Sequence, residues 1–210
     1  MQIIPTILEK DFTEVENKIL AVKNLVKRIQ VDVIDGTFSF GKTFELELIN
    51  RIENAENVLW ETHLMVKEPI NWIEKSIHIN ACRIIGQVEM MGEREGFITR
   101  VKDAGLEAGL AWDIETEIGE IPQETDVVLL LGRRAGFGSL PLEEKIYEKI
   151  QQLIKIREEN GLRFLIGVDG GINTGNIKKL EDMGVDIAYC GGAVFNGNVK
   201  DNLENLNYVS

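Results

Sequence analysis

The sequence predicts a single (β/α)8 barrel, and three observations carry that prediction. Short apolar runs alternate with longer amphipathic stretches about eight times along the 210 residues, as a closed parallel barrel requires. The apolar runs lack polar alternation, as expected of strands that are covered on both faces. The length suits one domain over residues 1–210. An open doubly wound sheet is the second choice, because such sheets more often use five or six strands.

The individual elements follow from apolar runs bounded by polar residues or glycine, and from stretches of helical period. The predicted strands are residues 3–8, 28–33, 58–63, 82–88, 107–112, 126–131, 163–168 and 187–190. The predicted helices are residues 11–27, 44–52, 69–77, 93–104, 142–160 and 174–183, with a turn of helix at 115–121 and a closing helix at 199–206. Asp11, with Glu14 three residues later, is typical of a capping box.

Composition narrows the class of protein. The net charge of −12 argues against a nucleic-acid partner, since binding to nucleic acid depends on clustered Lys and Arg. It does not exclude a small anion held by local backbone dipoles. No apolar run approaches the ~20 residues of a membrane helix, so we expect no membrane partner. Cys82 and Cys190 match no zinc or redox spacing, which indicates free thiols and a cytoplasmic setting.

Ionisable side chains stand at the ends of three predicted strands. Asp32 lies in the second strand run, His63 ends the third, and Asp169 follows the seventh. All strand ends of this kind meet at one face of a barrel. Two carboxylates and an imidazole at one mouth suggest a metal site with a pair of proton-transfer groups. Asp35 precedes a glycine and is more simply a turn former.

Glycine-rich segments follow the last three predicted strands. They are Gly136, Phe137 and Gly138 after the sixth, Gly170 and Gly171 after the seventh, and Gly191 and Gly192 after the eighth. Barrels often bind phosphate at the loops after strands seven and eight, so these segments predict a phosphate site. Arg133 and Arg134 precede the first segment. They are either exposed ion-pair partners or a contact for an anion.

A competing motif occupies residues 36–43. The letters GTFSFGKT match the G-x-x-x-x-G-K-[ST] nucleotide loop and follow a strand. However, Phe38 and Phe40 put bulky rings where such a loop wraps its backbone around phosphates, and this interpretation leaves His63 unused. A P-loop nucleotide hydrolase is therefore the least favoured function.

At these residues the chain resembles the ribulose-phosphate 3-epimerase family. The resemblance runs nearly end to end and rests on an ordered set of segments: PTILEKDF, QVDVIDGTF, THLMV, GFG, VDGGIN and GGAVF. It implies a metal-dependent epimerase in which Asp32 and Asp169 are the acid/base pair. The same two aspartates and His63 are then metal ligands, and Thr6 and Met65 belong to the substrate pocket.

The resemblance implies inversion of C3 of a ketose phosphate, most simply D-ribulose 5-phosphate to D-xylulose 5-phosphate in the pentose phosphate pathway. The partner is then a small phosphorylated sugar, and the cofactor is one divalent ion, namely Zn, Fe(II), Mn or Mg. The sequence leaves a homo-oligomer open.

Several positions depart from the family pattern. Gln30 stands where the family has a metal-ligand His, so Gln30 is at most a fourth and weaker ligand. Gln87 also replaces a family His, and Arg134-Ala135 replaces the residues that precede GFG. The alternative function is therefore a non-catalytic or substrate-shifted relative that binds a sugar phosphate.

Overall fold

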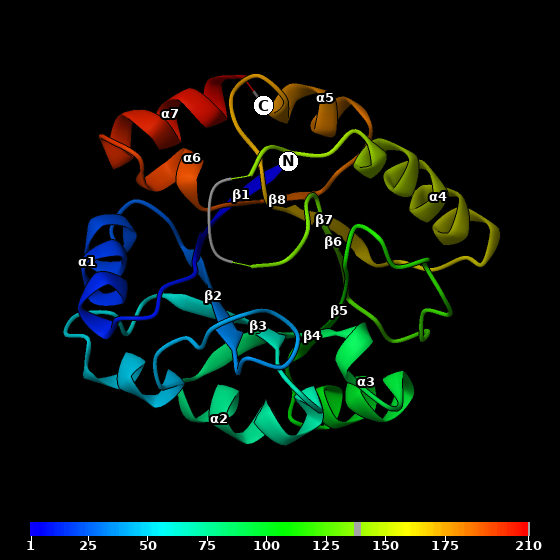
Figure 1. Ribbon diagram of the computed structural model, residues 1–210, viewed down its shortest axis with the longest axis horizontal. Helices are drawn as coiled ribbons and strands as arrows, with labels where there is room; N and C mark the ends of the chain where they lie inside the picture. Colours follow the sequence, from blue (N-terminus) through cyan, green and yellow to red (C-terminus); the bar gives the residue numbers. More distant parts are fainter. Residues whose placement is uncertain (137–139, 210) are drawn as a thin grey trace.

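Eight parallel strands close into a barrel in the computed structural model, which describes residues 1–136 and 140–209. Each strand pairs with its neighbours in chain order, and the first pairs with the last, so the predicted (β/α)8 class is confirmed (Figure 1). The strands are β1 Gln2–Ile7, β2 Arg28–Ile34, β3 Leu59–Met65, β4 Ala81–Gln87, β5 Glu107–Trp112, β6 Val127–Leu131, β7 Leu165–Asp169 and β8 Ile187–Cys190.

Helices surround the ring of strands in Figure 1. The α-helices are α1 Phe12–Val22, α2 Ile73–His78, α3 Arg94–Asp103, α4 Lys145–Glu159, α5 Ile177–Asp182, α6 Gly192–Phe195 and α7 Val199–Val209. Three 3₁₀ segments are added, namely η1 Leu46–Arg51, η2 Pro69–Trp72 and η3 Val88–Met90. No helix of the described chain is both long and apolar enough to cross a membrane.

Local sequence signals predicted the start of α1 correctly but were wrong for two other predicted helical segments. Asp11 caps α1 as predicted, because its carboxylate accepts from the amides of Thr13 and Glu14. The predicted helix at 44–52 is instead the 3₁₀ segment η1, and residues 115–121 form no helix. Glu115, Glu117 and Glu120 crowd like charges into that short connection, which disfavours a helix.

Residues 36–43 do not form a nucleotide loop. The amide of Thr43 donates to the Ile34 carbonyl at 3.0 Å, and Thr43 Oγ1 accepts from the Ile34 amide at 3.1 Å, so the segment folds back onto the end of β2. It leads into η1, whereas a P-loop leads directly into an α-helix. Phe40 projects into solvent, 91% exposed. The P-loop alternative is therefore not supported.

Two apolar layers form the core. The larger layer lies between the outer faces of the strands and the helices, and the smaller layer fills the barrel around Ile4, Ile85, Leu129 and Tyr189. The buried strands read as continuous apolar runs because both of their faces are covered.

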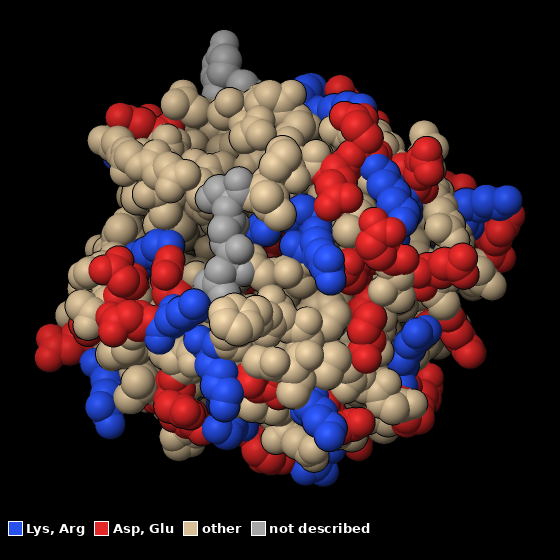
Figure 2. Space-filling view, viewed as in Figure 1, with Lys and Arg blue, Asp and Glu red and all other residues tan. Residues whose placement is uncertain are grey.

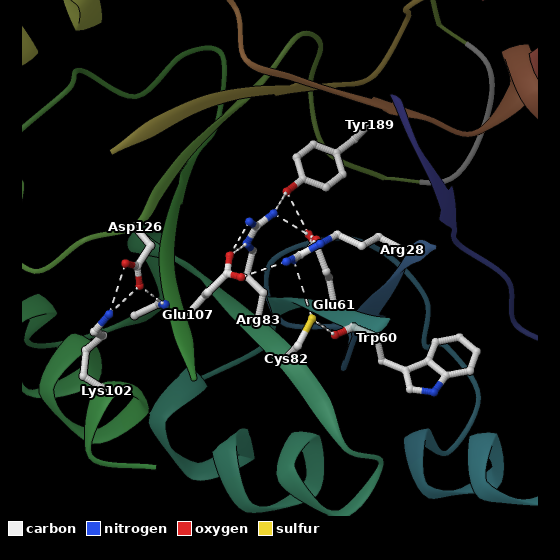
Figure 3. A network of polar contacts seen from close by, with 10 residues as sticks. Arg28, Trp60, Glu61, Cys82, Arg83, Lys102, Glu107, Asp126 and Tyr189 are labelled. Atoms are coloured by element: carbon white, nitrogen blue, oxygen red, sulfur yellow. Dashed lines mark hydrogen bonds and ion pairs between the residues drawn. The ribbon is translucent and has the colours of Figure 1, made fainter. Parts of the chain in front are cut away.

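Below the inner layer, charged side chains from within the first three residues of β2, β3, β4 and β5 cross the barrel (Figure 3). Arg83 of β4 lies between Glu61 of β3 and Glu107 of β5, and its guanidinium pairs with both carboxylates. Arg28 pairs with the same two glutamates, and the Tyr189 hydroxyl donates to Glu61 at 2.9 Å. The network bridges strands at the end opposite the strand C-termini.

Candidate active site and metal centre

Asp32, His63 and Asp169 converge at the C-terminal ends of β2, β3 and β7. One potential ligand atom of each lies within 4.8 Å of the others. The register explains the first pair, since Asp32 lies opposite His63 in the pairing of β2 with β3. Barrel closure brings Asp169 across from them. The structure thus places together the three ionisable residues that the sequence singled out.

Gln30 links the two carboxylates. Its amide nitrogen donates to Asp32 Oδ1 at 2.9 Å, to Thr6 Oγ1 at 3.0 Å and, more weakly, to Asp169 Oδ2 at 3.4 Å. The Thr6 hydroxyl donates in turn to Asp32 Oδ2 at 3.1 Å. Carboxylates only accept hydrogen bonds when ionised, so the amide nitrogen, rather than the oxygen that a metal requires, faces them. Gln30 would have to turn its amide over to act as a metal ligand.

His63 is held from the opposite side by a residue that the sequence identified only as a departure from the family pattern. Its Nε2 lies 2.9 Å from Gln87 Oε1, and Gln87 Nε2 donates to Glu89 Oε2 at 2.6 Å. Gln87 and Glu89 carry no motif of their own, and only the inward direction of β4 could have pointed to Gln87. Their position beside His63 was therefore missed.

The charges at this site are poorly solvated. Burial, followed by the charge of Asp32, raises the pKa of Asp169 to about 7. For His63, burial opposes the charged ring, but the Asp32 carboxylate, 3.3 Å from Nδ1, raises the net pKa of the imidazole. Two neighbouring carboxylates in a buried place are unfavourable unless a cation or a proton separates them.

The donor set fits a divalent cation. The carboxylates of Asp32 and Asp169 offer oxygen ligands and the His63 ring offers nitrogen, a combination that several divalent metals accept. His63 Nδ1 and Gln30 Oε1 are buried, and neither has a hydrogen-bond partner among residues 1–136 and 140–209. A buried polar atom without a partner is costly, so the unpartnered ring nitrogen of His63 beside two carboxylates favours a cation.

A cavity of about 1030 Å³ opens above this centre. It is lined by predicted substrate and phosphate residues, namely Thr6, Met65, Gly136, Gly170, Gly171, Gly191 and Gly192. Phe137 and Gly138, also predicted for the phosphate site, lie outside the described residues. Basic and acidic side chains are intermingled on the face seen in Figure 2.

Close packing explains the glycine pair after β7. Gly170 and Gly171 have φ values of +99° and +75°, and a Cβ on Gly171 would collide with the Leu142 amide nitrogen. A Cβ on Gly170 would lie 2.9 Å from Cγ of Arg133. Only glycine fits this conformation without strain. The backbone after β7 is therefore brought unusually close to the loop after β6.

The remaining polar residues that the sequence singled out differ in their position relative to the cavity. Arg133 is half-buried in the cavity wall and donates to the Gly136 carbonyl at 3.4 Å, while Arg134 is exposed at the cavity rim. Asp35 is structural, because its carboxylate accepts from the amides of Thr37 and Lys67. His78 is exposed at the end of α2.

The chain is similar to proteins of one enzyme family over nearly its whole length. The sequence model described as the Ribulose-phosphate 3 epimerase family matches residues 2–195. Proteins named ribulose-phosphate 3-epimerase from Treponema pallidum and Bacillus subtilis are 24% and 26% identical over 200 residues, covering 93% of this chain and 92% of each relative.

Solved structures share the fold at lower sequence identity. Phosphoribosyl anthranilate isomerase from Thermococcus kodakaraensis superposes with a TM-score of 0.66 at 16% identity, over 99% of this chain and 97% of that one. For 3-hexulose-6-phosphate synthase from Salmonella typhimurium the TM-score is 0.71 at 13% identity, over 100% and 98%. At such identities the likeness concerns the barrel alone.

Proposed function

The chain belongs to the ribulose-phosphate 3-epimerase family and is an epimerase, and from that premise we propose that it inverts C3 of D-ribulose 5-phosphate to give D-xylulose 5-phosphate. One observation carries the proposal, namely that two carboxylates from strands on different sides of the barrel meet beside a buried imidazole. Inversion needs an acid/base group on each face of the reacting carbon.

Asp32 and Asp169 are the proposed proton carriers. One carboxylate takes the proton from C3, and the C3–H electron pair passes to the adjacent carbonyl to give an enediolate. The other aspartate, present as the carboxylic acid, delivers its proton to the opposite face of C3, and the enediolate electron pair forms the new C3–H bond with inverted configuration. The raised pKa of Asp169, about 7, supports this role, since a group that titrates near neutral pH can both give and take a proton.

Asp32, His63 and Asp169 are the proposed metal ligands. When bound, a divalent ion supplies electrostatic stabilisation of the negative charge that develops on the substrate oxygen. The donor set is compatible with Zn, Fe(II), Mn or Mg. Gln30 holds the two carboxylates in a fixed relation through its amide nitrogen, and Thr6 fixes the second oxygen of Asp32.

The glycine segments at the cavity wall are the proposed phosphate site. Gly170, Gly171, Gly191 and Gly192 line the cavity after β7 and β8, where barrels commonly bind phosphate through backbone amides. Arg133 lies against Gly170, so its guanidinium is placed to meet the same anion.

The sequence also raised a non-catalytic or substrate-shifted relative. Because the chain is an epimerase, a shifted substrate is the form of this alternative that remains, and one observation favours it. Gln30 presents a donor where the family has a metal-ligand His, which weakens the site for metal. Losing one ligand reduces affinity without removing the other three groups, so epimerisation of ribulose 5-phosphate remains the better-supported function.

Solvent exchange at C3 separates the two functions. The metal-reconstituted protein is incubated with ribulose 5-phosphate in deuterated water, and deuterium at C3 is followed by NMR. We expect incorporation that disappears in Asp32→Asn and Asp169→Asn but persists in Asp103→Asn, which alters an exposed aspartate at the end of α3. Absence of exchange with each of the four metals would exclude epimerisation of this substrate.

A further inference from the structure

A chain of three side chains leads from the edge of the barrel mouth to the candidate metal centre. Glu89 accepts from the backbone amide of Asp113 at 2.9 Å through Oε1 and from Gln87 Nε2 at 2.6 Å through Oε2. Gln87, fully buried in β4, then meets His63 Nε2 at 2.9 Å through Oε1. Every link is within hydrogen-bonding distance.

The direction of this chain is fixed by Glu89. An ionised carboxylate only accepts hydrogen bonds, so Gln87 must turn its amide nitrogen toward Glu89 and its oxygen toward His63. The reversed amide would place two acceptors 2.6 Å apart at Glu89. An oxygen facing His63 Nε2 only accepts, so in the neutral ring Nε2 carries the hydrogen and Nδ1 keeps a lone pair.

That lone pair points at the site. His63 Nδ1 is buried and lies 3.3 Å from Asp32 Oδ1, and no described residue forms a hydrogen bond of good geometry with it. Without the Gln87 acceptor, the ring would place its hydrogen on Nδ1, where Asp32 can accept it. That tautomer has no free nitrogen beside the carboxylates.

We propose that Gln87 is a positioning residue, oriented by Glu89, that holds His63 in the Nε2–H tautomer and so commits Nδ1 to the divalent cation. The inference rests on the proposed function for the cation and adds the group that selects the ligating nitrogen. Partners of this kind outside the ligand shell typically change metal affinity by about 10–100-fold.

The two histidines of the chain make the tautomer directly observable. Ring ¹⁵N shifts are recorded on metal-free protein at a pH where both rings are neutral, with exposed His78 as the internal reference. We expect His63 to be Nε2–H in the native protein and Nδ1–H in Gln87→Leu. On addition of Zn²⁺ to the native protein, the Nδ1 signal should move while Nε2 keeps its hydrogen.

A swapped pair of residues tests the mechanism. In the double variant Gln87→Glu/Glu89→Gln, residue 87 still accepts from His63 Nε2, and residue 89 can still donate to it while accepting from the Asp113 amide. We expect this variant to restore the Nε2–H tautomer and near-native Zn²⁺ affinity, while Gln87→Leu loses about 10–100-fold. Gln151→Leu, on the exposed face of α4, should change neither.

The outcomes separate the two proposals. An Nε2–H ring in Gln87→Leu, or Zn²⁺ coordinated through Nε2 in the native protein, would overturn the positioning role whatever the activity. Weak Zn²⁺ binding by the swapped variant in spite of a restored tautomer would overturn it as well. If the tautomer and Nδ1 coordination are as expected but C3 exchange is absent, only the proposal of ribulose 5-phosphate as the substrate fails.

Discussion

Asp32 lies directly opposite His63 in the register between β2 and β3, with 3.3 Å between Asp32 Oδ1 and His63 Nδ1. Both side chains are buried. Neighbouring strands thus supply a carboxylate and an imidazole to one point, and Asp169 completes the group from β7. Because water screens these three groups poorly, a change in the charge of one of them alters the electrostatic energy of the other two.

The paired carboxylates should each be essential to turnover. We expect Asp32→Asn and Asp169→Asn to reduce kcat by roughly 10²–10⁴-fold, the usual contribution of a positioned acid/base group. A coupled assay for xylulose 5-phosphate measures the loss, and circular dichroism establishes that the variants fold. Asp103→Asn serves as the exposed control. A loss smaller than tenfold in either variant would argue against a two-carboxylate mechanism.

The stability of the metal-free protein should depend on pH through Asp169. Its folded pKa is raised to about 7, from 3.8, so between these values the folded state binds more protons than the unfolded state. The contribution of Asp169 to the free energy of unfolding therefore falls as the pH rises from about 4 to about 7.

Urea unfolding in the presence of a chelator, at pH 5 and pH 8, measures this effect. Asp169→Asn should lose less stability than the native protein over the interval, because it removes one titrating group. An equal loss in both proteins would show that Asp169 ionises normally in the fold.

Gln30 should determine how strongly the proposed centre binds metal. The substitution Gln30→His removes the amide donor to Asp32 and Asp169. It adds an imidazole, which is a better ligand for Zn²⁺. We expect Zn²⁺ affinity to rise about tenfold or more, as measured by competition with a chromophoric chelator. Unchanged affinity would mean that residue 30 does not face the metal. Gln151→Leu is the surface control.

Gly171 should tolerate no side chain, because a Cβ there would collide with neighbouring backbone. Gly105 is the matched control for the effect of positive φ alone. Gly171 and Gly105 share positive φ, +75° and +77°, but a Cβ has nothing within 4 Å at Gly105 and meets the backbone of Leu142 and Pro141 at Gly171. Gly105→Ala should cost the roughly 1–2 kcal/mol of left-handed strain.

Gly171→Ala should cost clearly more stability in urea unfolding, and KM for the phosphorylated sugar should rise only in this variant. Equal effects of the two substitutions would contradict the close approach of the β7 and β6 loops.

Arg83 should be the most sensitive residue of the charged network in Figure 3. Arg83→Met removes one of the two arginines that the described residues place against the buried Glu61 and leaves Arg28, so we expect a loss approaching the roughly 3–5 kcal/mol of a broken buried pair. The double variant Arg83→Met/Glu61→Leu should recover part of it. Arg100→Met, which breaks an exposed pair with Glu74, should cost at most about 1 kcal/mol. Denaturant titration compares the three variants.

The amino-acid order determined the barrel, because eight apolar runs without polar alternation have few other ways to cover both faces. It also placed Asp32, His63 and Asp169 at strand ends, where parallel topology brings such residues to one face. The prediction of an α-helix at 44–52 was wrong, because periodicity alone does not determine the hydrogen-bonding pattern of a short segment.

Only the tertiary structure decided how these groups are oriented. That Gln30 turns its nitrogen to both carboxylates, that Gln87 and Glu89 stand behind His63, and that Arg83 lies between two glutamates all follow from strand register and closure. Hydrogen-bond direction depends on which acceptors surround a side chain in three dimensions. Those neighbours are up to 139 residues apart in the chain, so the sequence names the reactive groups, and the closed barrel determines which of their atoms face one another.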